Sequence, residues 1–175
     1  MTETFSKPFD LLLGRKTYEI FAAFWPYAED GPDGSLAKLF NGTTKYVATR
    51  SSAPLTWKHS VAVHEPANDI AKLKREDGPD LLIQGSSVLI QTLLEHDLID
   101  RINLLVFPVV LGSGKRFFGD GAKGMALSLE SSKTSPSGVT MTRYTPAGSV
   151  KTGSFAVQPP TEAELVRREK MQQEV

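Results

Sequence analysis

A glycine, two basic residues and a hydroxyl residue stand together directly after a short apolar run. Gly14, Arg15, Lys16 and Thr17 follow the apolar residues 9–13. If a helix begins here, its backbone N–H groups and its dipole favour an anion, and the two cations and the hydroxyl suit a phosphate. An ordinary helix start with solvent-exposed basic residues explains the same sequence, so both interpretations stay open.

A second polar group follows the next predicted strand, at residues 46–48. Thr49, Arg50, Ser51 and Ser52 combine one guanidinium with three hydroxyl groups. Arginine beside hydroxyls is the chemistry that holds a phosphate dianion, such as the 2′-phosphate that distinguishes NADP from NAD. Taken alone, the same residues are also typical of a polar turn without a ligand.

A third group follows the apolar run at residues 80–83. Gln84, Gly85, Ser86 and Ser87 lead into a predicted helix. Glycine allows the backbone to approach a ligand closely, and the helix start can face a pyrophosphate. Simple N-capping of the helix by Ser86 or Ser87 is the alternative.

The glycine-rich segment at residues 112–124 is not a phosphate-binding loop of the Walker type. Gly112, Ser113, Gly114 and Lys115 resemble part of that motif, but residues 109 and 116 are Val and Arg where it needs Gly and Ser or Thr. A Rossmann glycine fingerprint is also missing from the sequence. We expect a flexible loop that closes beside the site or packs against a partner subunit.

Metal and nucleophile chemistry find little support in the residue types. The chain has no cysteine, and His59, His64 and His96 stand apart from one another and from acidic pairs, so we assign no metal. Ser86 and Ser87 lack the glycine-flanked elbow of a serine hydrolase. A catalytic residue is therefore not named.

Composition narrows the class of protein further. The chain has 175 residues with 20 basic and 20 acidic side chains, which gives a formal net charge of zero. This balance argues against a general nucleic-acid or anionic-membrane binder. Residues 1–10 contain no apolar signal core, and no apolar run approaches the ~20 residues of a membrane span. We expect a soluble, cytoplasmic protein without nucleic-acid or membrane partners.

Alternating strand and helix patterns must position the three polar groups. Strands are predicted at 9–13, 46–48, 61–63 and 80–84, a longer strand suited to the middle of a sheet at 102–110, and a hairpin near 127–141. Helices are predicted from residues 15, 35, 66, 87 and 161, and a Gly/Ser/Pro-rich linker at 146–160. This order indicates an α/β fold with a mostly parallel sheet and an antiparallel end.

Ligands of such sheets bind beyond the carboxyl ends of the strands. The three polar groups all follow strands, so they are expected to converge on one site. We expect one domain over residues 1–158 and a charged helix over residues 159–175.

Four segments in this order resemble the dihydrofolate reductase-like family. They are residues 13–19 (LGRKTYE), 47–51 (VATRS), 83–87 (IQGSS) and 108–118 (PVVLGSGKRFF). The closest resemblance is to the branch that contains the C-terminal reductase domain of the bifunctional riboflavin-biosynthesis deaminase-reductase, and it covers roughly residues 9–145. It implies a three-layer α/β/α sandwich with a mostly parallel central sheet and a C-terminal antiparallel hairpin.

The resemblance implies NADPH as the cofactor. Residues 14–17 would contact its phosphates, residues 49–51 its 2′-phosphate, and residues 84–89 its pyrophosphate and nicotinamide. The predicted cofactor-binding residues are Gly14, Arg15, Lys16, Thr17, Thr49, Arg50, Ser51, Gln84, Gly85, Ser86, Ser87 and Leu89.

The front of the chain departs from the family pattern. Family members usually begin with a strand, a mobile loop and a helix before the segment that matches Gly14–Thr17. Only about nine residues precede the first predicted strand here. We expect the N-terminal strand to be missing or shortened, which would leave backbone groups unpaired unless a second chain covers them.

The predicted function is NADPH-dependent hydride transfer to a small heterocyclic (pterin- or pyrimidine-like) or carbonyl substrate. A non-catalytic nucleotide-binding or dimeric scaffold protein of the same fold is the alternative. The apolar strand and the glycine-rich loop further suggest a homodimer.

Overall fold

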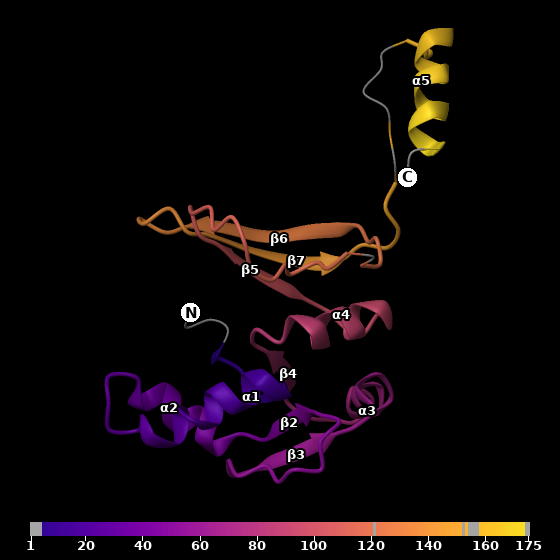
Figure 1. Cartoon of the computed structure of the whole chain (residues 1–175). Helices are drawn as coiled ribbons and strands as arrows, with labels where there is room; N and C mark the ends of the chain where they lie inside the picture. The colour runs from indigo at the N-terminus through magenta and orange to yellow at the C-terminus, as the bar shows by residue number, and fades with distance from the viewer. Residues whose placement is uncertain (1–4, 121, 152, 154–157, 174–175) are drawn as a thin grey trace.

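The computed structural model describes residues 5–120, 122–151, 153 and 158–173. Strands and helices alternate along the first two thirds of the chain, a hairpin follows, and a last helix ends it (Figure 1). The elements are β1 (Phe9–Gly14), α1 (Arg15–Ala22), the 3-10 helix η2 (Trp25–Tyr27), α2 (Gly34–Gly42), β2 (Lys45–Ala48), β3 (Ser60–Val63), α3 (Pro66–Leu73), β4 (Asp80–Ile83), α4 (Ser87–Glu95), β5 (Ile102–Val106), β6 (Leu127–Thr134), β7 (Thr140–Pro146) and α5 (Glu162–Gln173).

The first four strands form a parallel sheet in the order β3-β2-β1-β4. The central strand β1 carries Leu11, Leu12 and Leu13, which are at most 1% exposed. Such a continuous apolar run is typical of a strand that is covered on both faces by helices. The parallel register places the carboxyl ends of β1 and β2 side by side, with Gly14 opposite Ala48.

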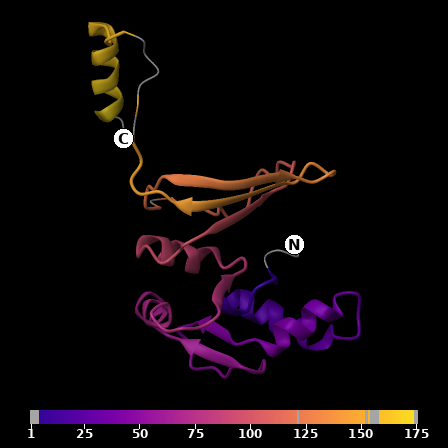
Figure 2. The same cartoon turned by 180° about the vertical axis from the view of Figure 1, so that it is seen from behind.

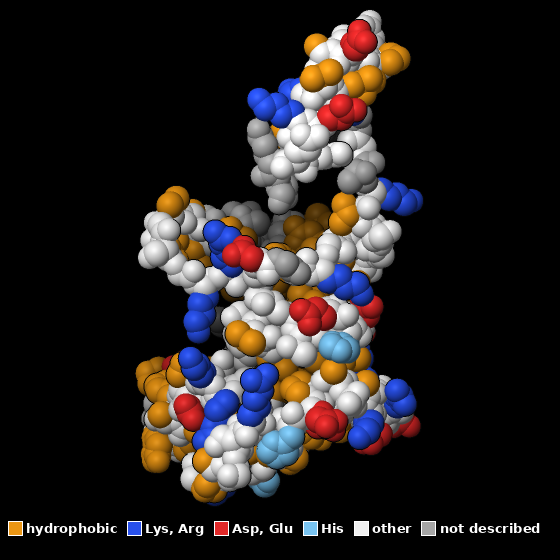
Figure 3. Space-filling model, turned by 45° about the vertical axis from the view of Figure 1, so that its right-hand side comes forward, with side chains coloured by type: hydrophobic (Ala, Val, Ile, Leu, Met, Phe, Trp, Pro, Cys, Tyr) orange, Lys and Arg blue, Asp and Glu red, His pale blue; other side chains and the backbone are white. Residues whose placement is uncertain are grey.

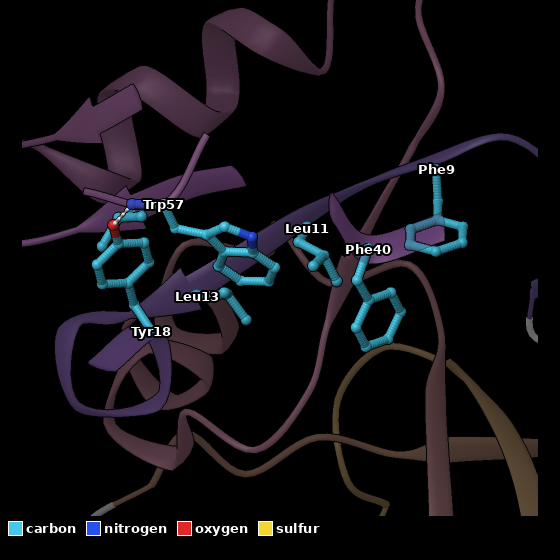
Figure 4. Close-up of a cluster of buried hydrophobic side chains, with 7 residues drawn as sticks. Phe9, Leu11, Leu13, Tyr18, Phe40 and Trp57 are labelled. Carbon is cyan, nitrogen blue, oxygen red and sulfur yellow. Dashed lines mark hydrogen bonds between the residues drawn. The ribbon is translucent and has the colours of Figure 1, made fainter. Parts of the chain in front are cut away.

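One face of this sheet holds an aromatic-rich core. Leu11 and Leu13 pack there with Phe9, Phe40 and Trp57 (Figure 4). The Trp57 backbone N–H donates a hydrogen bond of 2.9 Å to the hydroxyl of Tyr18 on α1. Its indole N–H donates one of 2.7 Å to Asn41 Oδ1. Both N–H groups of this buried residue are thus satisfied, and the core is linked to α1 and α2.

A lysine is buried beside that core. Lys45, at the start of β2, is fully buried and its Nζ donates hydrogen bonds to the backbone oxygens of Phe40, Asn41 and Thr43 at 2.8–3.1 Å. The ammonium also lies 4.3 Å from the centre of the Trp57 ring. These oxygens belong to the carboxyl end of α2, where a cation is favoured.

Helix α4 joins the parallel sheet to a second sheet. Leu89 and Leu93 pack with Leu12 of the parallel sheet, whereas Ile90 and Leu94 pack with Ile102 of β5. The two views of the ribbon agree in placing α4 between the two sheets (Figures 1 and 2). Because the two apolar faces contact different sheets, α4 fixes their relative position.

The second sheet has three antiparallel strands in the order β5-β7-β6. The β6–β7 hairpin turns over residues 135–139, where Gly138 has a φ of +80°. The expected hairpin and the mixed α/β class are therefore confirmed. The parallel and antiparallel parts, however, are separate sheets rather than one continuous sheet.

The observed strand β5 differs from the strand predicted at 102–110 in two ways. It ends at Val106, and it lies at the edge of the second sheet rather than in the middle. Pro108 supplies no N–H, which ends the pairing with β7 near this point. The exposed fractions of Val109 and Val110 are 64% and 98%.

The last helix, α5, stands apart from both sheets (Figure 1). Thr161 Oγ1 accepts the backbone N–H of Glu164 at 3.4 Å, while the Glu164 carboxylate binds Arg167 and Arg168. The helix begins one residue after the expected start. Residues 152 and 154–157 of the predicted linker lie outside the described residues.

Candidate functional site

One large open cavity extends between the two sheets along the whole of β4 and β5, and the carboxyl ends of β1, β2 and β4 border it. Its volume is about 2050 Å³, above the 300–1,000 Å³ usual for small-molecule sites. Eleven of the twelve residues predicted to bind a cofactor line it: Gly14, Arg15, Lys16, Thr17, Thr49, Arg50, Ser51, Gly85, Ser86, Ser87 and Leu89. Gln84 is not among the lining residues. The expected convergence of the three polar groups on one cavity is therefore observed.

Ser86 connects two of these groups directly. Its Oγ accepts a hydrogen bond of 2.9 Å from the backbone N–H of Gly14 and lies 3.0 Å from Thr17 Oγ1, to which it donates. Residues 72 positions apart in the sequence are thereby held together at the cavity. Ser86 makes no side-chain cap on α4, so the hydroxyl serves the contact with α1 instead of the N-capping alternative.

The turn from β4 into α4 has an unusual backbone. Gly85 and Ser86 have φ values of +59° and +56°. The left-handed region costs a non-glycine residue roughly 1–2 kcal/mol, so the structure holds Ser86 against a local preference. A Cβ on Gly85 would lie 3.7 Å from Thr17 Oγ1. Steric space is therefore sufficient at Gly85, and its φ is what favours glycine.

Two helices begin at the cavity. α1 starts at Arg15 and α4 at Ser87, and neither preceding residue makes a side-chain cap hydrogen bond. The N–H groups of a first helical turn lack partners within the helix and carry a partial positive charge. Both helix starts are suited to a negatively charged ligand.

The polar turn after β2 forms the third side. Thr49 is buried, its Oγ1 accepts the Ser51 backbone N–H at 3.1 Å, and its carbonyl oxygen lies 2.9 Å from His64 Nδ1. Arg50, between the two hydroxyl residues, is exposed and lines the cavity. Thr49 thus fixes the conformation of the turn, and the guanidinium of Arg50 stays exposed at the cavity.

Basic side chains dominate this end of the cavity. Arg15 is oriented by Glu19 at 2.7 Å and by the Ala53 carbonyl at 3.3 Å, which links α1 to the turn after β2. Lys16 and Arg50 are exposed and also line the cavity. The space-filling view shows lysine and arginine side chains gathered near the narrowing between the two sheets (Figure 3).

Several lining residues were not predicted to be part of the site. Lys115 and Arg116 of the glycine-rich segment reach the cavity, which agrees with the expected loop beside the site. His64 and Tyr46 also line it. Burial, followed by the charges of Asp10 and Glu76, raises the pKa of the Tyr46 hydroxyl. The basic residues of the glycine-rich loop can be recognised in the sequence. The position of Tyr46 at the cavity cannot, because it depends on the register of β2 in the sheet.

Clusters of metal-binding side chains and membrane-spanning helices are absent from the described ranges. Within residues 5–120, 122–151, 153 and 158–173, no group of three or more His, Asp or Glu side chains is placed to hold a metal ion. None of the helices in the same ranges has the length and apolar character needed to cross a bilayer.

Two solved structures share the fold. A putative riboflavin biosynthesis protein from Shewanella sp. PV-4 superimposes with a TM-score of 0.60 at 24% identity, covering 79% of this chain and 73% of that one. A pyrimidine reductase-like protein from Corynebacterium diphtheriae superimposes with a TM-score of 0.53 at 13% identity, covering 79% and 75%. These similarities establish the fold predicted from the four sequence segments.

Two Bacillus subtilis proteins are similar in sequence. YyaP is 32% identical over 136 residues, which cover 77% of this chain and 72% of YyaP. YwjB is 31% identical over 127 residues, which cover 70% of this chain and 66% of YwjB. The family model described as the RibD C-terminal domain matches residues 1–141. The chain therefore belongs to the RibD C-terminal domain family.

Proposed function

We propose that this protein is a reductase that binds NADPH and reduces a small heterocyclic (pterin- or pyrimidine-like) or carbonyl substrate. Family membership and the reductase-like structural neighbour support the reductase class. The observation that carries the cofactor assignment is the convergence of two helix starts and the Thr49–Ser51 turn on one cavity. Each of these parts suits a phosphate group.

The residues present fit such a cofactor in three respects. The three polar groups all border the one open cavity, so a cofactor that carries phosphates has access to each of them. Gly85 presents main chain without a side chain at the start of α4. Arg15, Lys16 and Arg50 supply positive charge where a dinucleotide carries its phosphates.

Each group of residues has a separate task in the proposed complex. Arg50, with the hydroxyls of Thr49 and Ser51, would hold the 2′-phosphate. Arg15, Lys16 and the start of α1 would hold the pyrophosphate from one side, and the start of α4 from the other. The Ser86 hydroxyl would fix the distance between these two helix starts through Gly14 and Thr17.

When bound, NADPH supplies a hydride to an electrophilic carbon of a C=N or C=O bond, and a proton from the solvent completes the reduction. The protein's part is to align the acceptor carbon with the nicotinamide and to exclude competing orientations. Lys115 and Arg116, which line the cavity, would be the cations that stabilise negative charge developing on the acceptor.

Oxidation of NADPH in the presence of a panel of pterin, pyrimidine and carbonyl acceptors tests the proposal. The expected result is acceptor-dependent loss of nicotinamide absorbance that Arg50→Ala slows and Arg75→Ala does not, because Arg75 is exposed and does not line the cavity. Saturable NADPH binding without reduction of any acceptor would contradict turnover and favour the scaffold alternative.

A further inference from the structure

The His64 side chain joins the ends of two neighbouring strands beside the candidate cofactor site. His64 follows β3 directly, and its Nδ1 lies 2.9 Å from the carbonyl oxygen of Thr49. The backbone N–H of Thr49 in turn donates a hydrogen bond of 3.0 Å to the carbonyl oxygen of Val63. Both backbone groups of Thr49 are thus bonded to the end of β3, so His64 is held next to the Thr49–Ser51 turn.

This contact determines which nitrogen of the His64 ring changes its charge. A carbonyl oxygen can only accept a hydrogen bond, so Nδ1 carries a proton in the neutral ring as well as in the charged ring. Nε2 presents a lone pair in the neutral ring and an N–H in the imidazolium ion. His64 is exposed and lines the cavity, so Nε2 is the ring nitrogen that remains for a ligand.

The charged groups next to His64 differ in where they are directed. Arg50, on the turn after β2, lines the cavity, whereas Glu65 and Asp69 at the start of α3 do not. The Glu65 carboxylate accepts a hydrogen bond of 3.1 Å from the side chain of Asn68. The Asp69 carboxylate accepts the backbone N–H of Glu65 at 3.2 Å. Both carboxylates are therefore bonded within the first turn of α3, and Arg50 and His64 are left at the cavity.

The other charged residues that line the cavity near these elements belong to different segments. Lys16 lies at the start of α1, and Lys74 and Glu76 follow the carboxyl end of α3. Within residues 49–52 and 64–69, all of which the structure describes, Arg50 and His64 are the ionisable side chains that border the cavity.

We propose that His64 is a second cation for the 2′-phosphate of NADPH and makes the preference for NADPH over NADH depend on pH. This inference rests on the proposed function and adds a residue to it. A phosphate dianion offers only acceptor oxygens, so the imidazolium ion supplies a donor and a positive charge, whereas the neutral ring supplies neither at Nε2. Imidazole ordinarily changes its charge between about pH 5 and 8. Acidification within this range should therefore strengthen the contribution of His64 to NADPH binding.

Titration of wild type and His64→Asn with NADPH and NADH at about pH 6 and about pH 8.5, at constant ionic strength, tests this role. Asparagine keeps an N–H donor for the Thr49 carbonyl and removes Nε2. At the lower pH the wild type should bind NADPH at least roughly threefold more tightly than His64→Asn, the effect of a solvent-exposed charge contact. At the higher pH the two proteins should differ less than about twofold, and NADH should bind both equally at either pH.

Comparing two proteins at the same pH separates His64 from the titration of the ligand. The 2′-phosphate itself gains a proton at roughly pH 6, which affects wild type and variant alike. His96→Asn is the matched control, because His96 is also exposed and its Nδ1 lies 2.9 Å from the carbonyl oxygen of Thr92, but it does not line the cavity. This variant should follow the wild type at both pH values.

The outcomes separate this inference from the proposed function. If the wild type prefers NADPH but His64→Asn binds it equally well at both pH values, the role of His64 is overturned and the proposed function stands. An equal loss at both pH values would also overturn it, because His64 would then only hold the turn, and so would a matching loss in His96→Asn. Failure of the wild type to bind NADPH at either pH would overturn the proposed function and this inference together.

Discussion

The hydroxyl of Ser86 lies 2.9 Å from the backbone nitrogen of Gly14 and accepts its hydrogen bond. This contact joins the start of α4 to the end of β1, across the floor of the candidate cofactor site. Ser86 makes it from a left-handed backbone conformation with a φ of +56°. The same residue thus carries a stabilising contact and a conformational cost.

Two substitutions separate these contributions. Ser86→Ala removes the hydrogen bonds to Gly14 and Thr17 and keeps the unfavourable φ, so we expect unfolding free energy to fall by about 1–3 kcal/mol. Ser86→Gly removes the same bonds but relieves the strain, so it should be more stable than the alanine variant by roughly 1 kcal/mol. Urea unfolding measures the difference. Equal stability of the two variants would show that Ser86 is not strained.

Gly85 should be intolerant of a side chain for a backbone reason. Gly85→Ala places alanine at a φ of +59°, and we expect a loss of about 1–2 kcal/mol of unfolding free energy together with weaker nucleotide binding. Gly78→Ala is the matched control, because a Cβ there meets nothing within 4 Å and its φ is not positive. The control should be neutral or slightly stabilising. A similar loss in both variants would contradict the explanation.

Lys45 should make stability depend on pH in the alkaline range. Burial lowers the pKa of its ammonium to about 8, and the charge of Asp10 opposes this shift. Between about pH 8 and the unfolded pKa of 10.5, the unfolded chain holds a proton on Lys45 that the folded chain has released. The contribution of Lys45 to stability therefore rises with pH across this window, by roughly 1–3 kcal/mol, and is constant below it.

Chemical unfolding at several pH values, compared between the wild type and Lys45→Met, isolates this contribution from other titrating groups. The variant should be less stable at pH 7, because the carbonyl groups of Phe40, Asn41 and Thr43 lose a donor. It should also lack the alkaline rise. Lys58→Met, at an exposed position, should follow the wild type. Parallel profiles for wild type and Lys45→Met would contradict the assignment.

Much of the site was visible in the sequence because its elements are local. Apolar runs ending in glycine, hydroxyl and basic residues predicted β1, β2 and β4 and the helices after β1 and β4, and parallel pairing placed the ends of the strands together. The contact between Ser86 and Gly14 was not predictable, because it joins residues 72 positions apart and depends on the φ of Ser86.

The separation of the two sheets was not predicted, because the sequence indicated one mostly parallel sheet with an antiparallel end. Which strand edges stay unpaired depends on long-range pairing. Residues 102–110 read as an interior strand because they are apolar, whereas Ile102–Val106 forms an edge. The burial of Lys45 was also unexpected, since lysine is rarely buried and only the end of α2 explains it.

The most direct test of the central claim is a titration of NADPH and NADH against the wild type, Arg50→Ala and Arg75→Ala, read by nicotinamide fluorescence. The wild type should prefer NADPH. Arg50→Ala should weaken NADPH binding roughly 10- to 100-fold, the loss expected for a charged hydrogen bond, and change NADH binding less than about twofold. Arg75→Ala should leave both unchanged. Equal losses of NADPH and NADH in Arg50→Ala, or no binding of either by the wild type, would contradict the account.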